Sequence, residues 1–133
     1  MAGTFTLEVV TPGELLFKDE VQFIVVPETY GELGVLRNHA PMIAALDIGV
    51  IRFTDAEGRI RRMAVSGGFM EVMNNEARVL AETAEIGDEI DVLRAKAAKE
   101  RAEARLAAKA ADTNMARAQA ALQRAIARMK AAE

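Results

Sequence analysis

A change of hydrophobic period at Gly87-Asp88 constrains the fold of this chain more than any other feature of its sequence. Up to this point apolar and polar residues alternate with period two between turn residues, which is typical of short, half-buried strands. Beyond it nearly every residue is a strong helix former, alanine predominates, and neither glycine nor proline occurs. A chain of 133 residues is too short for two full-sized cores. The sequence therefore predicts a β head over residues 1–87 and a helical tail over residues 88–133.

The head is expected to consist of short strands joined by tight turns. Asn74-Asn75 tolerates positive φ and suits a hairpin, Gly67-Gly68 predicts a bulge or tight bend, and Pro27 is expected to end a strand. The predicted strands cover residues 5–9, 15–17, 21–25, 47–54, 59–65, 69–73 and 76–82. Because no helical pattern separates them, they favour an antiparallel β-sandwich over a parallel α/β sheet.

The tail is expected to form two helices folded into an antiparallel hairpin. A polar break at residues 112–114 interrupts the helical pattern, and Asp88 is the expected N-cap of the first helix. After Ile90 the first helix has only Leu93 and Leu106 as large apolar residues. The second helix carries an apolar stripe formed by Met115, Ala118, Leu122, Ile126 and Met129. Since full burial of a Leu, Ile or Met contributes about 1.5–3 kcal/mol, a tail with so few of them should dock lightly and be able to detach.

The chain lacks the side chains that most enzymes use. It has no cysteine, one histidine, His39, and one serine, Ser66. The sequence around Ser66 lacks the first glycine of a nucleophile elbow, and no glycine-rich phosphate loop occurs. Scattered carboxylates form no metal-binding pattern, so neither catalytic residues nor metal ligands are expected. These absences favour an interaction or regulatory subunit.

Arginines of the tail are its most informative polar residues. Arg94, Arg101 and Arg105 share one helical face, and Arg124 and Arg128 lie one turn apart on the second helix. One interpretation is a solvated surface with ion pairs to nearby glutamates. The other is recognition of phosphate by guanidinium groups that converge when the hairpin folds.

Charge is distributed unevenly, with a net charge of -6 on residues 1–87 and +3 on residues 88–133. The basic tail could attract its own head, an acidic partner or a phosphate-bearing ligand. Nucleic acid is not an expected partner, because the tail has no aromatic residue and the whole chain carries a charge of -3. No signal-peptide pattern and no apolar run of about 20 residues is found, so direct membrane insertion is not expected.

Four stretches together resemble the epsilon subunit of bacterial F-type ATP synthases. They are residues 10–14 (VTPGE), 31–36 (GELGVL) with 38–41 (NHAP), 64–72 (AVSGGFMEV) and 90–95 (IDVLRA). Their order and spacing extend the resemblance over almost the entire chain. It implies a ten-stranded β-sandwich followed by a two-helix domain; the pattern of the residues agrees with this arrangement but gives fewer strands, with short ones expected among residues 31–46.

The resemblance also implies partners and a location. The head would lie in the central stalk against the gamma subunit and the c ring, with Glu32, Gly34 and His39 as partner-binding residues. Arg37 stands where the family usually has proline. The hairpin would either fold onto the head or extend toward the catalytic beta subunits, where it inhibits ATP hydrolysis. The protein would be peripheral, on the cytoplasmic face of the bacterial plasma membrane.

In bacillus-like members of this family the folded hairpin binds ATP, and the resemblance carries this ligand over. The implied ATP-binding residues are Glu85, Ile90, Asp91, Arg94, Ala95, Arg101, Arg124 and Arg128. ATP would act as a regulatory ligand without turnover, and no evident site requires magnesium. Two alternatives remain at this point: an unrelated β-sandwich adaptor with a coiled-coil hairpin, and a small enzyme.

Overall fold

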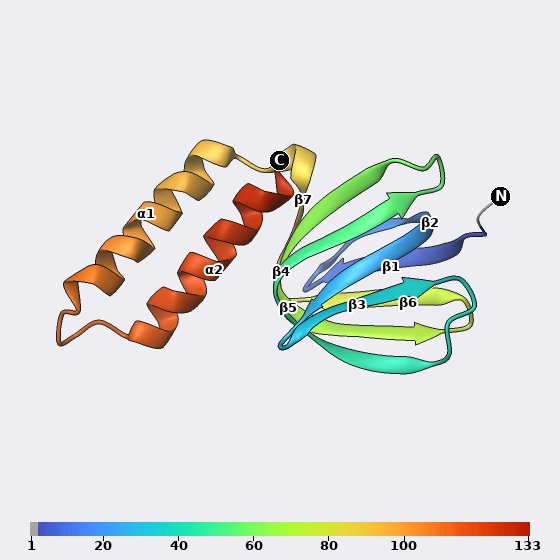
Figure 1. Cartoon of the computed structure of the whole chain (residues 1–133), viewed down its shortest axis with the longest axis horizontal. Helices are drawn as coiled ribbons and strands as arrows, with labels where there is room; N and C mark the ends of the chain where they lie inside the picture. Colours follow the sequence, from blue (N-terminus) through green and yellow to red (C-terminus); the bar gives the residue numbers. More distant parts are fainter. Residues whose placement is uncertain (1–2) are drawn as a thin grey trace.

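The computed structural model describes residues 3–133 and has two parts, a β-sandwich head and a two-helix hairpin (Figure 1). Within these residues the strands of the head are β1 (Phe5–Thr11), β2 (Glu14–Glu28), β3 (Gly31–Leu36), β4 (Met42–Asp55), β5 (Ile60–Met73), β6 (Glu76–Ala81) and β7 (Ala84–Ile86). A 3₁₀-helix η1 (Gly87–Glu89) leads to the helices α1 (Val92–Ala108) and α2 (Met115–Ala131). The predicted fold class is confirmed.

The strands of the head close on themselves because β1 pairs with both β6 and β2. Their order is β1-β6-β5-β4-β2-β3, and β7 pairs with β5. The β1–β6 pairing is parallel, whereas the other pairings are antiparallel. The long strands β4 and β5 run together from one layer of the sandwich into the other (Figure 1).

The core lies between the two layers of the sandwich. Phe5, Leu7 and Val9 of β1 point into it and are at most 2% exposed, as their alternation predicts. The main cluster of buried apolar residues extends from Phe5 to Ala81, and neither helix contributes to it. The head therefore has its own core.

Two predicted strand boundaries were wrong, because the chain continues as a strand through the exposed polar residues 18–20 and through the bend at Gly67-Gly68. Residues 15–17 and 21–25 belong to the single strand β2, and residues 59–65 and 69–73 to the single strand β5. The register of β2 on β4 shifts between Val21 and Phe23. Beyond the shift Ile24 and Val26 are buried, while Phe23 is 38% exposed.

Turn residues account for most of the predicted connections. Asn74 and Asn75 both have positive φ, as the hairpin prediction requires. Gly68 has a φ of 134°, and an ideal Cβ there would lie 2.0 Å from the backbone oxygen of Leu80, so only glycine fits the bend within β5. Pro27 does not end its strand but pairs with Glu32. The sequence pattern missed β3 and β7, which are short and rich in glycine or glutamate.

Asp91, not Asp88, caps α1. The carboxylate of Asp91 accepts a hydrogen bond from the backbone N–H of Arg94 at 3.0 Å. The predicted cap was wrong because η1 takes up Asp88 before the helix begins. Asn114 caps α2 in the same way, by accepting from the backbone N–H of Arg117 at 3.0 Å.

The hairpin docks through α2, which lies between α1 and the head (Figure 1). Ala127 and Ala131 are buried against Ala64 of β5 and Ile90, beside the partly buried Ile48 and Val50. Neither helix of the described chain has the length and apolar character of a membrane span. Docking rests on small side chains, as the scarcity of large apolar residues in the tail predicts.

Asp55 is the buried charged residue of the described head, at the turn between β4 and β5. Its Oδ1 accepts hydrogen bonds from the backbone N–H groups of Arg59 at 2.9 Å and Glu57 at 3.0 Å. The bond from Arg59 is the main cause that lowers the pKa of Asp55 below its ordinary value of 3.8.

We expect a chain that ends at Gly87 to fold, because the main core lies entirely in the head. Loss of the contact with Ile90 should lower its free energy of unfolding by at most about 3 kcal/mol. Dispersed amide signals in ¹H–¹⁵N NMR spectra of the shortened chain are the expected result. A collapsed spectrum, with the full chain dispersed, would contradict a self-sufficient head.

We expect the charge of Asp55 to stabilise the head above pH 3.8 and to lose this effect as the pH falls through its lowered folded-state pKa. Asp55→Asn keeps the Oδ1 acceptor and removes the charge. Urea unfolding of both proteins should show a stability difference at neutral pH that vanishes in acid. A difference independent of pH would refute the role of the charge, and Asp55→Ala should be less stable than Asp55→Asn throughout.

Candidate functional site

A cleft of about 300 Å³ opens where the hairpin meets the head. Its lining comes from β7, η1 and both helices. The lining residues are Glu85, Glu89, Asp91, Arg94, Ala95, Ala98, Arg101 and Arg128. The structure therefore brings together six of the eight residues implied for ATP, from β7, from α1 with its N-cap, and from α2.

The first turn of α1 is fixed by its cap. Asp91 holds the backbone N–H of Arg94 through its carboxylate and that of Ala95 through its own carbonyl, both at 3.0 Å. Arg94, Ala98 and Arg101 then follow at helical spacing on the face that borders the cleft. The same spacing could have identified Ala98 from the sequence.

An ion pair joins the two sides of the cleft. The Nε of Arg128 on α2 donates to Oε1 of Glu85 on β7 at 2.8 Å. Among the described residues, no carboxylate lies within ion-pair distance of Arg94 or Arg101. Two arginines of the cleft therefore keep their guanidinium groups available for an anion, and the geometry of phosphate suits such groups.

Ile90 and Arg124 do not line this cleft. Ile90 is 9% exposed and packs against Ala64, Ala127 and Ala131, so it supports the cleft from behind. Arg124 is half-buried, one helical turn before Arg128 on α2. The sequence suggested a common face for these arginines but could not fix how α2 is rotated against the head.

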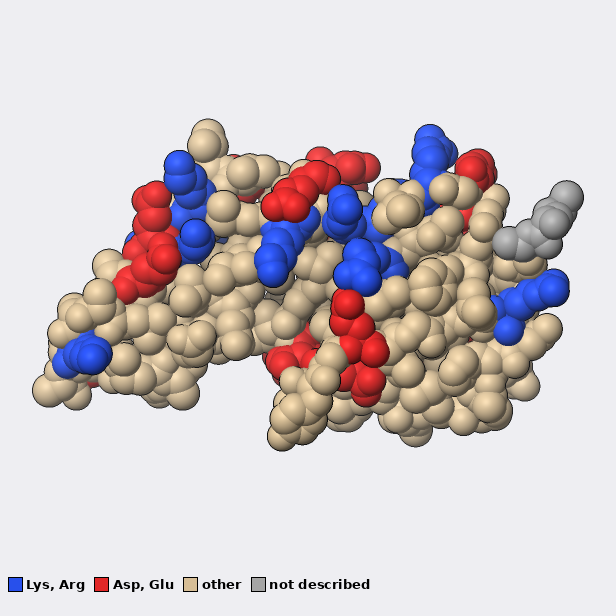
Figure 2. Space-filling view, viewed as in Figure 1, with Lys and Arg blue, Asp and Glu red and all other residues tan. Residues whose placement is uncertain are grey.

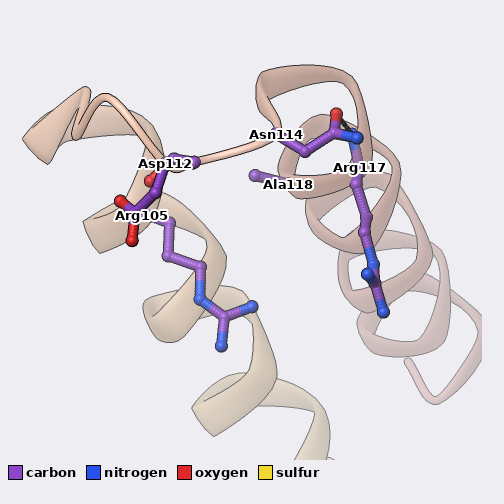
Figure 3. Close-up of a pocket in the computed structure, with 6 residues that line it drawn as sticks. Arg105, Asp112, Asn114, Arg117 and Ala118 are labelled. Atoms are coloured by element: carbon purple, nitrogen blue, oxygen red, sulfur yellow. Dashed lines mark hydrogen bonds between the residues drawn. The ribbon is translucent and has the colours of Figure 1, made fainter.

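Arg105 lies outside the cleft as well. It borders a larger hollow of about 400 Å³ at the far end of the hairpin, together with Asp112, Arg117 and Ala118. Figure 3 shows that the guanidinium groups of Arg105 and Arg117 lie apart. The hollow does not bring its two arginines to one point.

The surface distribution of charge agrees with the position of the cleft. Figure 2 shows lysine and arginine side chains gathered around the junction of hairpin and head, with acidic side chains on both sides of them. Within residues 3–133 no group of three carboxylate or histidine side chains could hold a metal ion. The arginines of the cleft give it the means to bind an anion.

The three predicted partner-binding residues lie along one edge of the head. Glu32 and Gly34 are exposed on β3, and Glu32 forms a double hydrogen bond to Arg52 of β4, at 2.8 and 3.3 Å. His39 follows β3 and is half-buried, with its Nδ1 donating to the backbone oxygen of Ala40 at 2.8 Å. They do not form a single cluster, because Glu32 and His39 are separated by the length of the strand.

An apolar patch is left exposed on the outer face of the sheet. Phe69 of β5 lies opposite Ala45 of β4 on one side and Leu80 of β6 on the other. Ile43, two residues from Ala45, is 72% exposed, Phe69 57% and Leu80 47%. We call Ile43, Ala45, Phe69 and Leu80 the outer apolar patch; contiguous exposed apolar side chains of this kind mark interaction surfaces.

Family models match both parts of the chain. Residues 4–87 match the model described as "ATP synthase, Delta/Epsilon chain, beta-sandwich domain". Residues 88–133 match the model described as "ATP synthase, Delta/Epsilon chain, long alpha-helix domain".

Relatives of similar length carry one name. A protein named "ATP synthase epsilon chain" from Syntrophomonas wolfei is 63% identical over 131 residues, which are 98% of this chain and 96% of the relative. Another of that name, from Desulforamulus reducens, is 51% identical over the full length of both chains. In a cryo-EM structure of the Euglena gracilis mitochondrial ATP synthase, a chain with 23% identity has the same fold, with a TM-score of 0.77 over 92% of this chain and 78% of that one.

Proposed function

Since the chain belongs to the delta/epsilon family of ATP synthase subunits, we propose that it couples the central stalk to the c ring and regulates ATP hydrolysis through a hairpin that binds ATP. The carrying observation is the cleft, whose lining combines Glu85 of the head with arginines of both helices. The match to family relatives over nearly all of both chains argues against an unrelated adaptor with a coiled-coil hairpin. A small enzyme finds no support in the residues of the cleft.

The outer apolar patch is the proposed contact with the gamma subunit. It lies on β4, the strand whose Ile48 and Val50 lie under α2. Burial of such side chains in a stalk would stabilise association by the hydrophobic effect. Glu32, Gly34 and His39 are the proposed contact with the c ring, which keeps the protein peripheral on the cytoplasmic face of the membrane.

ATP is the proposed ligand of the cleft. Arg94 and Arg101 from α1 and Arg128 from α2 can surround one polyphosphate only when the two helices lie antiparallel, and Glu85 adds a contact from the head when the hairpin is docked. Asp91 and Ala95 lie at the same end and suit the nucleoside, while Ile90 holds their helix in place. Arg128 would share its guanidinium between Glu85 and the phosphates.

Binding of this kind favours one conformation. A ligand at ten times its dissociation constant stabilises the state that binds it by about 1.4 kcal/mol, which shifts a two-state equilibrium about tenfold. ATP would therefore keep the hairpin folded, and low ATP would release it toward the beta subunits. This is sensing without turnover.

We expect Arg101→Ala, in the cleft, to weaken ATP binding by the isolated chain about 10- to 100-fold, the loss of one charge-assisted hydrogen bond. Arg105→Ala removes the same side chain one turn further along α1, outside the cleft, and should bind as the wild type does. Isothermal calorimetry measures both. No saturable binding by the wild type, or equal losses in the two variants, would refute the ATP site.

Removal of residues 88–133 should raise ATP hydrolysis by the assembled enzyme severalfold, because the hairpin is the proposed inhibitor. Arg101→Ala should lower hydrolysis instead, since its hairpin is present but no longer held folded by ATP. Steady-state hydrolysis assays over a range of ATP concentrations compare the two. Unchanged rates in the shortened protein would refute inhibition by the hairpin.

A further inference from the structure

Gly87 lies in close contact with the end of α2. An ideal Cβ at Gly87 would lie 2.1 Å from the backbone oxygen of Ala131, 3.1 Å from its carbonyl carbon and 3.3 Å from the backbone oxygen of Arg62. Gly87 is not among the glycines with positive φ. Glycine is therefore required here for space alone, and all three neighbouring atoms belong to the backbone.

A side chain at this position would have to move one of two elements. On one side, Gly87 directly follows β7, which pairs with β5 through Ile86 and Met63. On the other side, the end of α2 is held by small contacts: Nη1 of Arg62 donates to the backbone oxygen of Glu133 at 3.2 Å, and Ala131 packs on Ile90. The end of α2 is the weaker side, so α2 would move.

The contact also sets the width of the cleft. Glu85 and Asp91 flank Gly87 in the chain, and Arg128 lies almost one helical turn before Ala131. Displacement of Ala131 from Gly87 therefore carries Arg128 away from Glu85, which borders the cleft from β7. From this geometry we infer that Gly87 is a positioning residue, at which any side chain releases the end of α2 and opens the cleft.

Gly87→Ala tests the inference in the isolated full-length chain, without nucleotide, by hydrogen exchange of backbone amides. Overpacking of this kind lowers the free energy needed to open the end of α2, by an amount similar to a typical allosteric coupling free energy. The amides of the last two turns of α2 should therefore exchange roughly 5- to 150-fold faster than in the wild type. Amides of β1, β2 and β6 should be unchanged. Asp88→Ala, an exposed neighbour in the same turn, is the matched control and should leave α2 protected.

Unchanged protection of α2 in Gly87→Ala would overturn the inference, and so would faster exchange throughout the head, which would make Gly87 a requirement of the β fold. Equal loss of protection in Asp88→Ala would also overturn it, because altered stiffness of the turn would then explain the effect.

A second measurement rests on the proposed ATP site. If the wild type binds ATP, Gly87→Ala should need a proportionally higher ATP concentration to regain protection of α2, and recovery at the wild-type concentration would overturn the positioning role. If the wild type binds no ATP, the proposed function fails, and the exchange result without nucleotide still decides on Gly87.

Discussion

The hairpin is held on the head by the small side chains at the end of α2. Ala127 and Ala131 bury only methyl groups, at about 0.8 kcal/mol per buried carbon, and the larger apolar residues they meet are Ile90 and the partly buried Ile48 and Val50. The ion pair between Arg128 and Glu85 is partly exposed to solvent, and pairs of this kind contribute at most about 1 kcal/mol. The free energy that holds the hairpin on the head is therefore comparable to the free energy that binding of a metabolite supplies. A reversible switch requires these two quantities to be similar.

The period-two pattern of the sequence was enough to predict the head, and the loss of that pattern was enough to predict the hairpin. What it could not predict is where a strand continues through an irregularity. The bulge after Val21 and the bend at Gly67-Gly68 each reverse which side chains face the core, so strict alternation placed Phe23 in the core and divided β5 into two strands. The parallel pairing of β1 with β6 depends on closure of the whole head and leaves no local signal.

The candidate site could likewise be predicted only in part from the sequence. Spacing along α1 predicted that Arg94 and Arg101 share a face, because helical geometry is local. It also grouped Arg105 with them, although the cleft ends before that residue. Arg124 shows a second limit, since its place depends on the rotation of α2, which tertiary packing of alanines decides. The sequence could not identify Asp91 as the cap, because neighbouring Asp88 fits the same sequence rule. It could not identify Gly87 as a contact residue, because its neighbour Ala131 is far away in the sequence.

Ile48 and Val50 lie under α2 and become exposed whenever the hairpin leaves. In water, this exposure of apolar surface raises the free energy of the released state. It would also favour association between copies of the free chain. Inside a rotary complex, neighbouring subunits can cover the same strip. Release of the hairpin is then coupled to assembly of the complex. In the unassembled subunit, the cost of exposing Ile48 and Val50 to water keeps the hairpin docked, whereas in the complex neighbouring subunits can cover these residues.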